Sequence, residues 1–208
     1  MKAVGDFLFI FGKTIYEKAN YLFTSLYSFY NYFFLARFER FKSRNTKTYD
    51  ATIALNYDKI LDYTYPKLYK LVPRDKMKEA LIATFNGTDE MKVKILAVDP
   101  NFNYGEIKTI DDQKICLVKH NLSMEITLNE TLEDEDVEMM IDLLKSTMET
   151  EDITFDKEKT TFKINKIATM IAISDELTNN QWRFLNKDKE NKLMAMLLNK
   201  KVVKELGL

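Results

Sequence analysis

His120 is the only histidine of the chain, and it lies in a stretch with the alternating pattern of a strand. It shares the phase of Val118 and Leu122, so its imidazole should point to the apolar face of that strand. On a curved sheet this face lines a concavity, where a titratable group can act as a base or bind a ligand. The alternative is a histidine that is hydrogen-bonded within the core or lies at a frayed rim of the sheet.

Two aromatic residues near the C-terminus form the second group of interest. Trp182 and Phe184 alternate with Gln181 and Arg183, which indicates a strand with one aromatic face. They either fill the core or form the wall of the same concavity. The sequence thus predicts a ligand pocket, without an assigned catalytic residue, lined by His120, Val118, Leu122, Trp182 and Phe184.

The residue types do not provide a metal or cofactor site. With one histidine and one cysteine, Cys116, no zinc constellation is available. The turn that begins at Asp99 lacks the calcium-loop pattern, because its twelfth place is Ile110 and carries no carboxylate. The acidic run 130–138 suits the positive end of a helix dipole. There is also no glycine-rich phosphate loop and no nucleophile elbow, so we expect no cofactor and no metal.

The remaining pattern gives the elements that must position these residues. Helical spacing is expected over 53–71 with a break near Tyr65, over 73–86, from Val137 to Met148, and from Leu193 to Leu206. Strands are expected over 92–98, 102–110, 116–128, 153–155, 161–166, 167–173 and 181–185. Connections of hairpin length imply antiparallel pairing. The predicted fold class is α+β, with helices packed on a curved antiparallel sheet in the order ααβββαβββα, after an aromatic-rich N-terminal helical segment.

Residues 1–49 differ from the rest of the chain and hold 15 of its 26 aromatic residues. Residues 19–36 are uncharged, and basic residues flank them. Four interpretations stay open: a cleaved secretory signal, a membrane span, a helix that lies at a membrane interface or packs on protein, and a start assigned too far upstream. We therefore predict a segment 1–49, which is an anchor, a docking helix or a mis-assigned start, followed by one α+β domain over 50–208.

Charge separates the same two parts. Residues 1–50 carry eight basic and four acidic side chains, whereas residues 51–208 carry 23 basic and 28 acidic ones. The mildly acidic body argues against a nucleic-acid partner. Residues 1–49, which we call the aromatic leader, are basic and would suit an anionic membrane surface. The cell envelope, as periplasm or membrane, is therefore favoured over the cytoplasm. A membrane or protein partner bound through 1–49, and a homo-oligomer, are the partner classes left open.

Three stretches carry a family resemblance: residues 62–72, residues 117–124, and residues 170–175 together with 181–185. They resemble uncharacterised exported-type proteins of Flavobacterium-like bacteria, over roughly residues 53–206. The element order is similar to the cone-shaped folds of nuclear-transport-factor-2 and cystatin proteins. The resemblance implies an α+β fold and brings no activity with it.

Two functional hypotheses follow. The first is a non-enzymatic binding or assembly module, attached to a membrane or another protein through its aromatic leader. The second is a small-molecule-binding or enzymatic cavity in the sheet concavity, with His120 as the polar group.

Overall fold

The computed structural model describes residue 35 and residues 37–207 of the 208-residue chain. Two units, divided between Thr46 and Lys47, are described separately below. Most of the uncharged run 19–36 lies outside the described residues, and so do the interpretations that depend on it. Among the described residues, no helix has the length and apolar character needed to cross a membrane.

The described part of the first unit is helical. The rings of Phe38 and Phe41 lie 6.1 Å apart, and the Lys42 ammonium lies 4.6 Å from the centre of the Phe38 ring. Lys42 also pairs with Glu39 at 3.0 Å. These contacts confirm an aromatic-rich helical segment ahead of the sheet.

The second unit begins with the last turns of the helix of residues 37–53 and continues with α-helices, 3-10 helices (η) and strands. In chain order they are α2 (Tyr57–Tyr63), η1 (Pro66–Lys70), α3 (Arg74–Asn86), β1 (Met91–Leu96), β2 (Asn103–Tyr104), β3 (Lys108–Ile110), β4 (Gln113–Leu128), α4 (Asp134–Met148), β5 (Ile153–Asp156), β6 (Thr161–Ser174), η2 (Glu176–Thr178), β7 (Arg183–Asn186), α5 (Lys192–Leu197) and α6 (Lys200–Leu206). The α+β fold class is confirmed.

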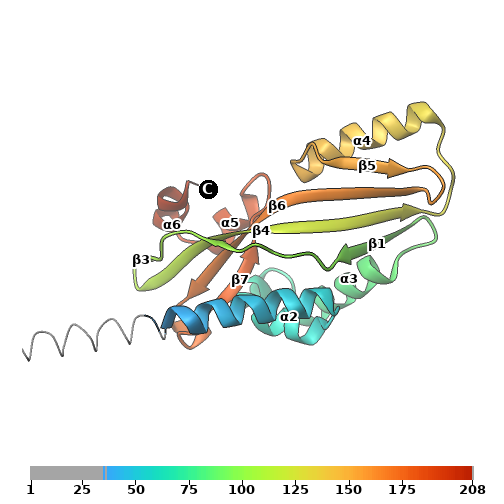
Figure 1. The fold of residues 1–208 in the computed structure, drawn as a ribbon. Helices are drawn as coiled ribbons and strands as arrows, with labels where there is room; N and C mark the ends of the chain where they lie inside the picture. The colour runs from blue at the N-terminus through green and yellow to red at the C-terminus, as the bar shows by residue number, and fades with distance from the viewer. Residues whose placement is uncertain (1–34, 36, 208) are drawn as a thin grey trace, which may run out of the picture. The chain divides into compact units, whose positions relative to one another are not determined.

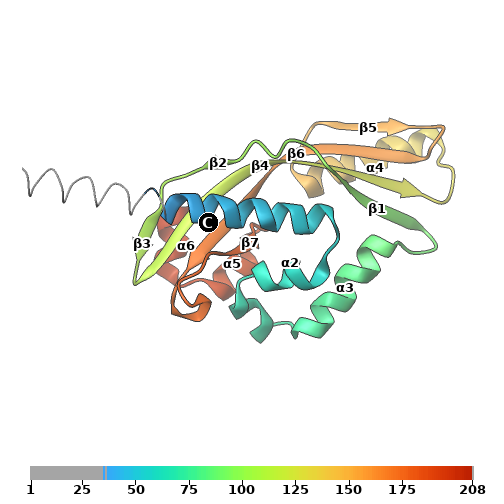
Figure 2. The same ribbon diagram turned by 60° about the horizontal axis from the view of Figure 1, so that its bottom comes forward.

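The sheet is built on two long neighbouring strands, β4 and β6. They pair antiparallel over 14 residues in one unbroken register, from Lys114 opposite Ser174 to Thr127 opposite Thr161. The other five strands are short and add to these two: β1, β2 and β3 pair with β4, and β5 and β7 pair with β6. Figure 2 shows β1 and β5 on opposite sides of the long pair. The seven-stranded sheet is antiparallel, as predicted, and it is open.

Each end of the long pair is covered on a different face. Because the register never slips, even-numbered residues of β4 and β6 share one face and odd-numbered residues share the other. On the even face, which we call the α4 face, α4 packs at one end over Met124, Ile126, Phe162 and Ile164. On the odd face, the α5 face, α5 and α6 pack at the other end over Ile115, Leu117, Ile171 and Ile173. Figure 1 shows α4 near one end of the strands and α5 with α6 near the other.

Proline and glycine set the predicted helix boundaries. α2 ends at Tyr63, and Pro66 opens the 3-10 turn η1, so the break expected near Tyr65 is present. α3 follows Pro73 and ends at Gly87, whose φ of 83° is accessible to glycine at no cost. The first helical pattern is interrupted earlier than predicted, at residues 54–55.

Three further boundaries differ from the predictions. The strand expected over 102–110 is two short strands, because the chain leaves the ladder around Gly105, where an added Cβ would lie 3.1 Å from the Leu117 carbonyl oxygen. The strands expected over 161–166 and 167–173 are one strand, since every residue keeps its β4 partner. The C-terminal helix is two helices, because the Asn199 side chain caps a new start by accepting from the Val202 amide at 2.8 Å.

Candidate ligand-binding site

His120 lies on the α4 face, in the phase that the alternation predicts, and is 7% exposed. Its ring centre lies 5.9 Å from that of Phe102 and 6.3 Å from that of Tyr49. Nδ1 lies 3.0 Å from the Asn121 carbonyl oxygen, which only accepts, so the proton belongs on Nδ1. Burial lowers the pKa of His120, and the bond to Asn121 offsets part of that effect. The imidazole is thus held neutral among aromatic rings.

The other residues predicted to line a pocket lie in different surroundings. Val118 and Phe184 are buried on the same face as His120, with Phe184 opposite Ala172 of β6. Trp182 is partly buried and precedes β7. Leu122 alone of the five lines the hollow described next. A ligand site at His120 stays a prediction.

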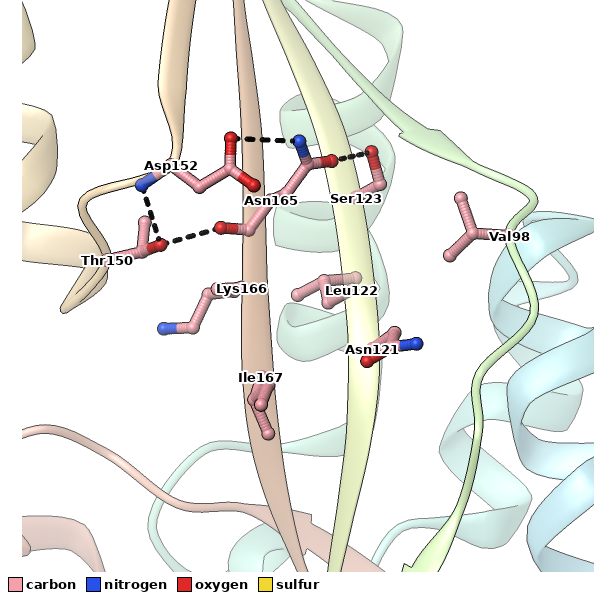
Figure 3. Close-up of a pocket in the computed structure, with 9 residues that line it drawn as sticks. All are labelled: Val98, Asn121, Leu122, Ser123, Thr150, Asp152, Asn165, Lys166 and Ile167. Atoms are coloured by element: carbon pink, nitrogen blue, oxygen red, sulfur yellow. Dashed lines mark hydrogen bonds between the residues drawn. The ribbon is translucent and has the colours of Figure 1, made fainter.

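A hollow of about 420 Å³ lies midway along the sheet, between the two cores. Its lining residues come from β4, β6, the approach to β5 and the segment after β1: Val98, Asn121, Leu122, Ser123, Thr150, Asp152, Asn165, Lys166 and Ile167. Figure 3 shows these side chains gathered around the neighbouring strands β4 and β6. Six of the nine lining residues have polar side chains, and the apolar side chains of Val98, Leu122 and Ile167 complete the lining.

A chain of hydrogen bonds in the wall of the hollow joins β4, β6 and the residue before β5 (Figure 3). The Ser123 hydroxyl donates to Asn165 Oδ1 at 2.7 Å, and Asn165 Nδ2 donates to Asp152 Oδ1 at 3.3 Å. This pattern fixes the orientation of the Asn165 amide, because a flipped amide would turn its oxygen toward the carboxylate. We call the three side chains the polar bridge. It holds the Asp152 carboxylate at the rim of the hollow.

The backbone of Asn165 is also fully engaged. Its amide donates to the Asp152 carbonyl at 2.9 Å, and its carbonyl accepts from the Thr150 hydroxyl at 2.6 Å. The Thr150 hydroxyl in turn accepts from the Asp152 amide at 3.2 Å. These bonds fix the approach to β5 against β6.

Two lysines, Lys166 of the hollow and Lys189, stabilise the end of α4. The Lys166 ammonium donates to the Met148 carbonyl, and the Lys189 ammonium donates to the Ser146 carbonyl at 2.6 Å. Both carbonyls lie in the last turn of α4, where cations complement the helix dipole. The Lys166 ammonium is therefore bound to α4. On the α5-face side of the hollow, the charged side chain is that of Asp152.

The edge of β6 beside the hollow is open at Ile167. Along β6, pairing with β5 ends at Ile164, and pairing with β7 begins at Met170. Outside these ladders, the Asn165 amide bonds to Asp152 and the Thr169 carbonyl accepts from the Lys187 amide at 2.9 Å. Residues of a strand alternate in the side to which their N–H and C=O point, so the polar groups of Ile167 face outward with those of Asn165 and Thr169.

No strand of the described chain pairs with Ile167 on this outward side. The Ile167 side chain is 68% exposed. We call residues 165–169 the β6 notch, because β5 and β7 both stop short of its centre. A sheet edge with free polar backbone groups is a template for pairing with another chain.

The polar side chains of the hollow are joined to one another by hydrogen bonds. The Ser123 hydroxyl donates to an amide oxygen, which takes no proton from it, so the hydroxyl is not activated as a nucleophile. Within residues 35 and 37–207, no group of three or more histidine, cysteine, aspartate or glutamate residues is arranged to hold a metal ion. Comparison with protein-family models and with curated proteins finds no match to this chain.

Apart from Leu122, sequence reasoning missed the residues of the hollow and the notch. Asn165 and Ile167 fell on either side of a strand boundary placed at residue 166, which the structure does not have. A single strand over 161–174 would have placed Asn165 and Ile167 on one face of the sheet. The gap between β5 and β7 has no local sequence signal.

Proposed function

We propose that this chain is a non-enzymatic binding module that holds one extended segment of a partner protein at the β6 notch. The observation that carries the proposal is the backbone of Ile167, whose N–H and C=O face an open edge beside the hollow. Extended peptides bind sheet edges through such main-chain groups, and neighbouring pockets select their side chains. The hollow would receive the side chains of the bound segment.

The recessed form of the notch favours a peptide segment over a second copy of the chain. Asp152 and Lys187 bond to β6 on either side of Ile167, so they occupy the line that an added strand would follow. Two recessed edges of this kind cannot lie side by side at the strand spacing of about 4.8 Å. A single flexible segment can enter from the α5 face, pair through one residue and leave again.

We further propose that residues 1–49 attach this module to a membrane or to a protein partner, consistent with the cell envelope. Their aromatic and basic composition supports this role, as does the acidic remainder of the chain. The likeness to exported bacterial proteins and to nuclear-transport-factor-2 or cystatin folds is part of the same proposal. The α+β architecture is compatible with it.

Selection from a random linear peptide library, displayed on phage, tests binding at the notch. The affinity of each selected peptide is measured by fluorescence anisotropy for three proteins: the unaltered full chain, its Ile167→Lys variant and its Met139→Lys variant. Met139 is a matched control, because it is 67% exposed and lies on α4 outside the hollow. We expect peptides that bind the unaltered chain and Met139→Lys equally, and Ile167→Lys at least about tenfold more weakly. Failure to obtain any peptide that distinguishes the two variants would contradict the proposal.

A further inference from the structure

This inference rests on the proposed function and concerns the kind of segment that the notch accepts. The hollow presents one carboxylate on its α5-face side, that of Asp152. Asp152 Oδ1 accepts from Asn165, and no ion pair to Asp152 is present among the residues that the structure describes. Its second oxygen is therefore available to a ligand.

The carboxylate is held in position before any ligand arrives. The polar bridge fixes one oxygen, and the backbone of Asp152 is bonded to both Asn165 and Thr150. A positioned carboxylate loses little conformational freedom when it receives a donor, which favours a charge-assisted hydrogen bond. The lysine in the lining, Lys166, donates instead to the Met148 carbonyl of α4 and belongs to the even-numbered face.

The register places this carboxylate within reach of a paired segment. A residue opposite Ile167 projects its side chain to the same face as Ile167, which is the α5 face. Asp152 lies opposite Asn165, two residues along β6 and about 7 Å away at the rise of a strand. The long aliphatic stem of a lysine or arginine spans such a distance and carries its charge at the end.

We infer that the segment bound at the β6 notch carries a lysine or arginine at or next to the residue that pairs with Ile167, and that Asp152 receives this cation. Main-chain bonds to Ile167 hold the segment, and the Asp152 carboxylate selects its side chain. Asn121, also exposed in the hollow, uses its Nδ2 on the Asp99 carbonyl, so its Oδ1 is a further acceptor for the same cation.

Three synthetic peptide pools test this inference. They have random sequences around one central position, fixed as lysine, norleucine or glutamate, and binding to the full chain is measured by fluorescence anisotropy. We expect the lysine pool to bind at least about fivefold more tightly than the norleucine pool, with the glutamate pool weakest. The advantage of lysine should diminish as salt is added.

Two variants test whether Asp152 causes the preference for the lysine pool. Asp152→Asn keeps an acceptor for Asn165 and removes the charge, so it should abolish the lysine advantage and leave norleucine binding unchanged. Glu151→Gln is the matched control, because Glu151 is 87% exposed, pairs with Lys145 and does not line the hollow. Equal binding of the lysine and norleucine pools, or a lysine advantage that survives Asp152→Asn, would overturn the inference while leaving the notch intact. Loss of binding by all pools to the unaltered chain would instead contradict the proposed function.

Discussion

The Tyr65 hydroxyl donates to the Asp175 carboxylate at 2.7 Å, across 110 positions of sequence. Both residues are buried, and the same carboxylate oxygen accepts from Gln113 Nε2 at 2.7 Å. The other oxygen accepts from the Thr178 amide at 3.1 Å and caps η2. One buried carboxylate thus joins η1, the start of β4 and the turn after β6 at the edge of the core beneath α5 and α6.

Removing the Tyr65 hydroxyl should destabilise this corner. Tyr65→Phe leaves the ring in place and removes a donor from a buried carboxylate, for which about 1–3 kcal/mol is expected. Urea unfolding followed by circular dichroism measures the loss. Tyr57→Phe is the control, since Tyr57 stacks on Phe85 and its hydroxyl has no hydrogen bond within the described structure. Equal effects of the two variants would contradict the assignment.

The buried state of His120 predicts a loss of stability in mild acid. Burial holds its pKa below the usual value near 6.5, so the unfolded chain binds this proton more readily. The stability contribution is present above that value and is lost as pH falls through the lower pKa of the folded chain. The slope is at most about 1.4 kcal/mol per pH unit for one proton.

Urea midpoints between about pH 7.5 and about pH 5 test the titration of His120. His120→Phe keeps an aromatic ring between Tyr49 and Phe102 and removes the titrating group. Its midpoint should depend less on pH over this range than that of the unaltered chain. An identical slope for both proteins would show that His120 does not titrate as its burial predicts.

Exchanging the amide and the carboxylate of the polar bridge tests the hydrogen bond between Asn165 and Asp152. Asn165→Asp replaces the Nδ2 donor with an oxygen that faces the exposed Asp152 carboxylate, so we expect a destabilisation of up to about 1 kcal/mol at neutral pH. Adding Asp152→Asn restores one donor and one carboxylate in exchanged positions. The double variant should recover most of the loss, measured as the coupling energy of a double-mutant cycle. Additive effects would mean that the two side chains do not interact.

The fold was largely predictable from the sequence because its longest strand, β4, alternates in polarity. Cys116 to Leu128 follow period two along β4, and the structure keeps that period without a bulge. Pro66 and Gly87 marked helix boundaries through backbone chemistry that acts locally. Gly105 and Asn199 gave no equally clear signal, since their effects depend on a close approach and a cap seen only in three dimensions.

The candidate site could not be predicted in the same way. The alternating pattern predicted the face on which His120 lies. Its neighbours Tyr49 and Phe102 come from distant segments, and Tyr49 belongs to the aromatic leader. The notch at Ile167 arises because β5 and β7 pair with different stretches of one strand. The residues around Ile167 do not indicate how far β5 or β7 extends along β6.

The attachment role of the leader is tested by deleting residues 1–34. This deletion spares the helix of residues 37–53, in which Tyr49 bonds to the Val98 backbone at 2.7 Å beside the hollow. We expect the deletion to move the protein between cell fractions or to change its oligomeric state by light scattering. If both stay the same while the shortened chain remains folded, residues 1–34 do not attach the module.

The most direct test of the notch is amide hydrogen exchange at Ile167, read by NMR in the free chain and with a selected peptide. The amides of Lys166 and Ala168 point toward β4 and should be protected, whereas the Ile167 amide should exchange at least about a hundredfold faster. Bound peptide should then slow exchange at Ile167 specifically. An Ile167 amide as protected as its two neighbours in the free chain, or unaffected by peptide, would contradict the account.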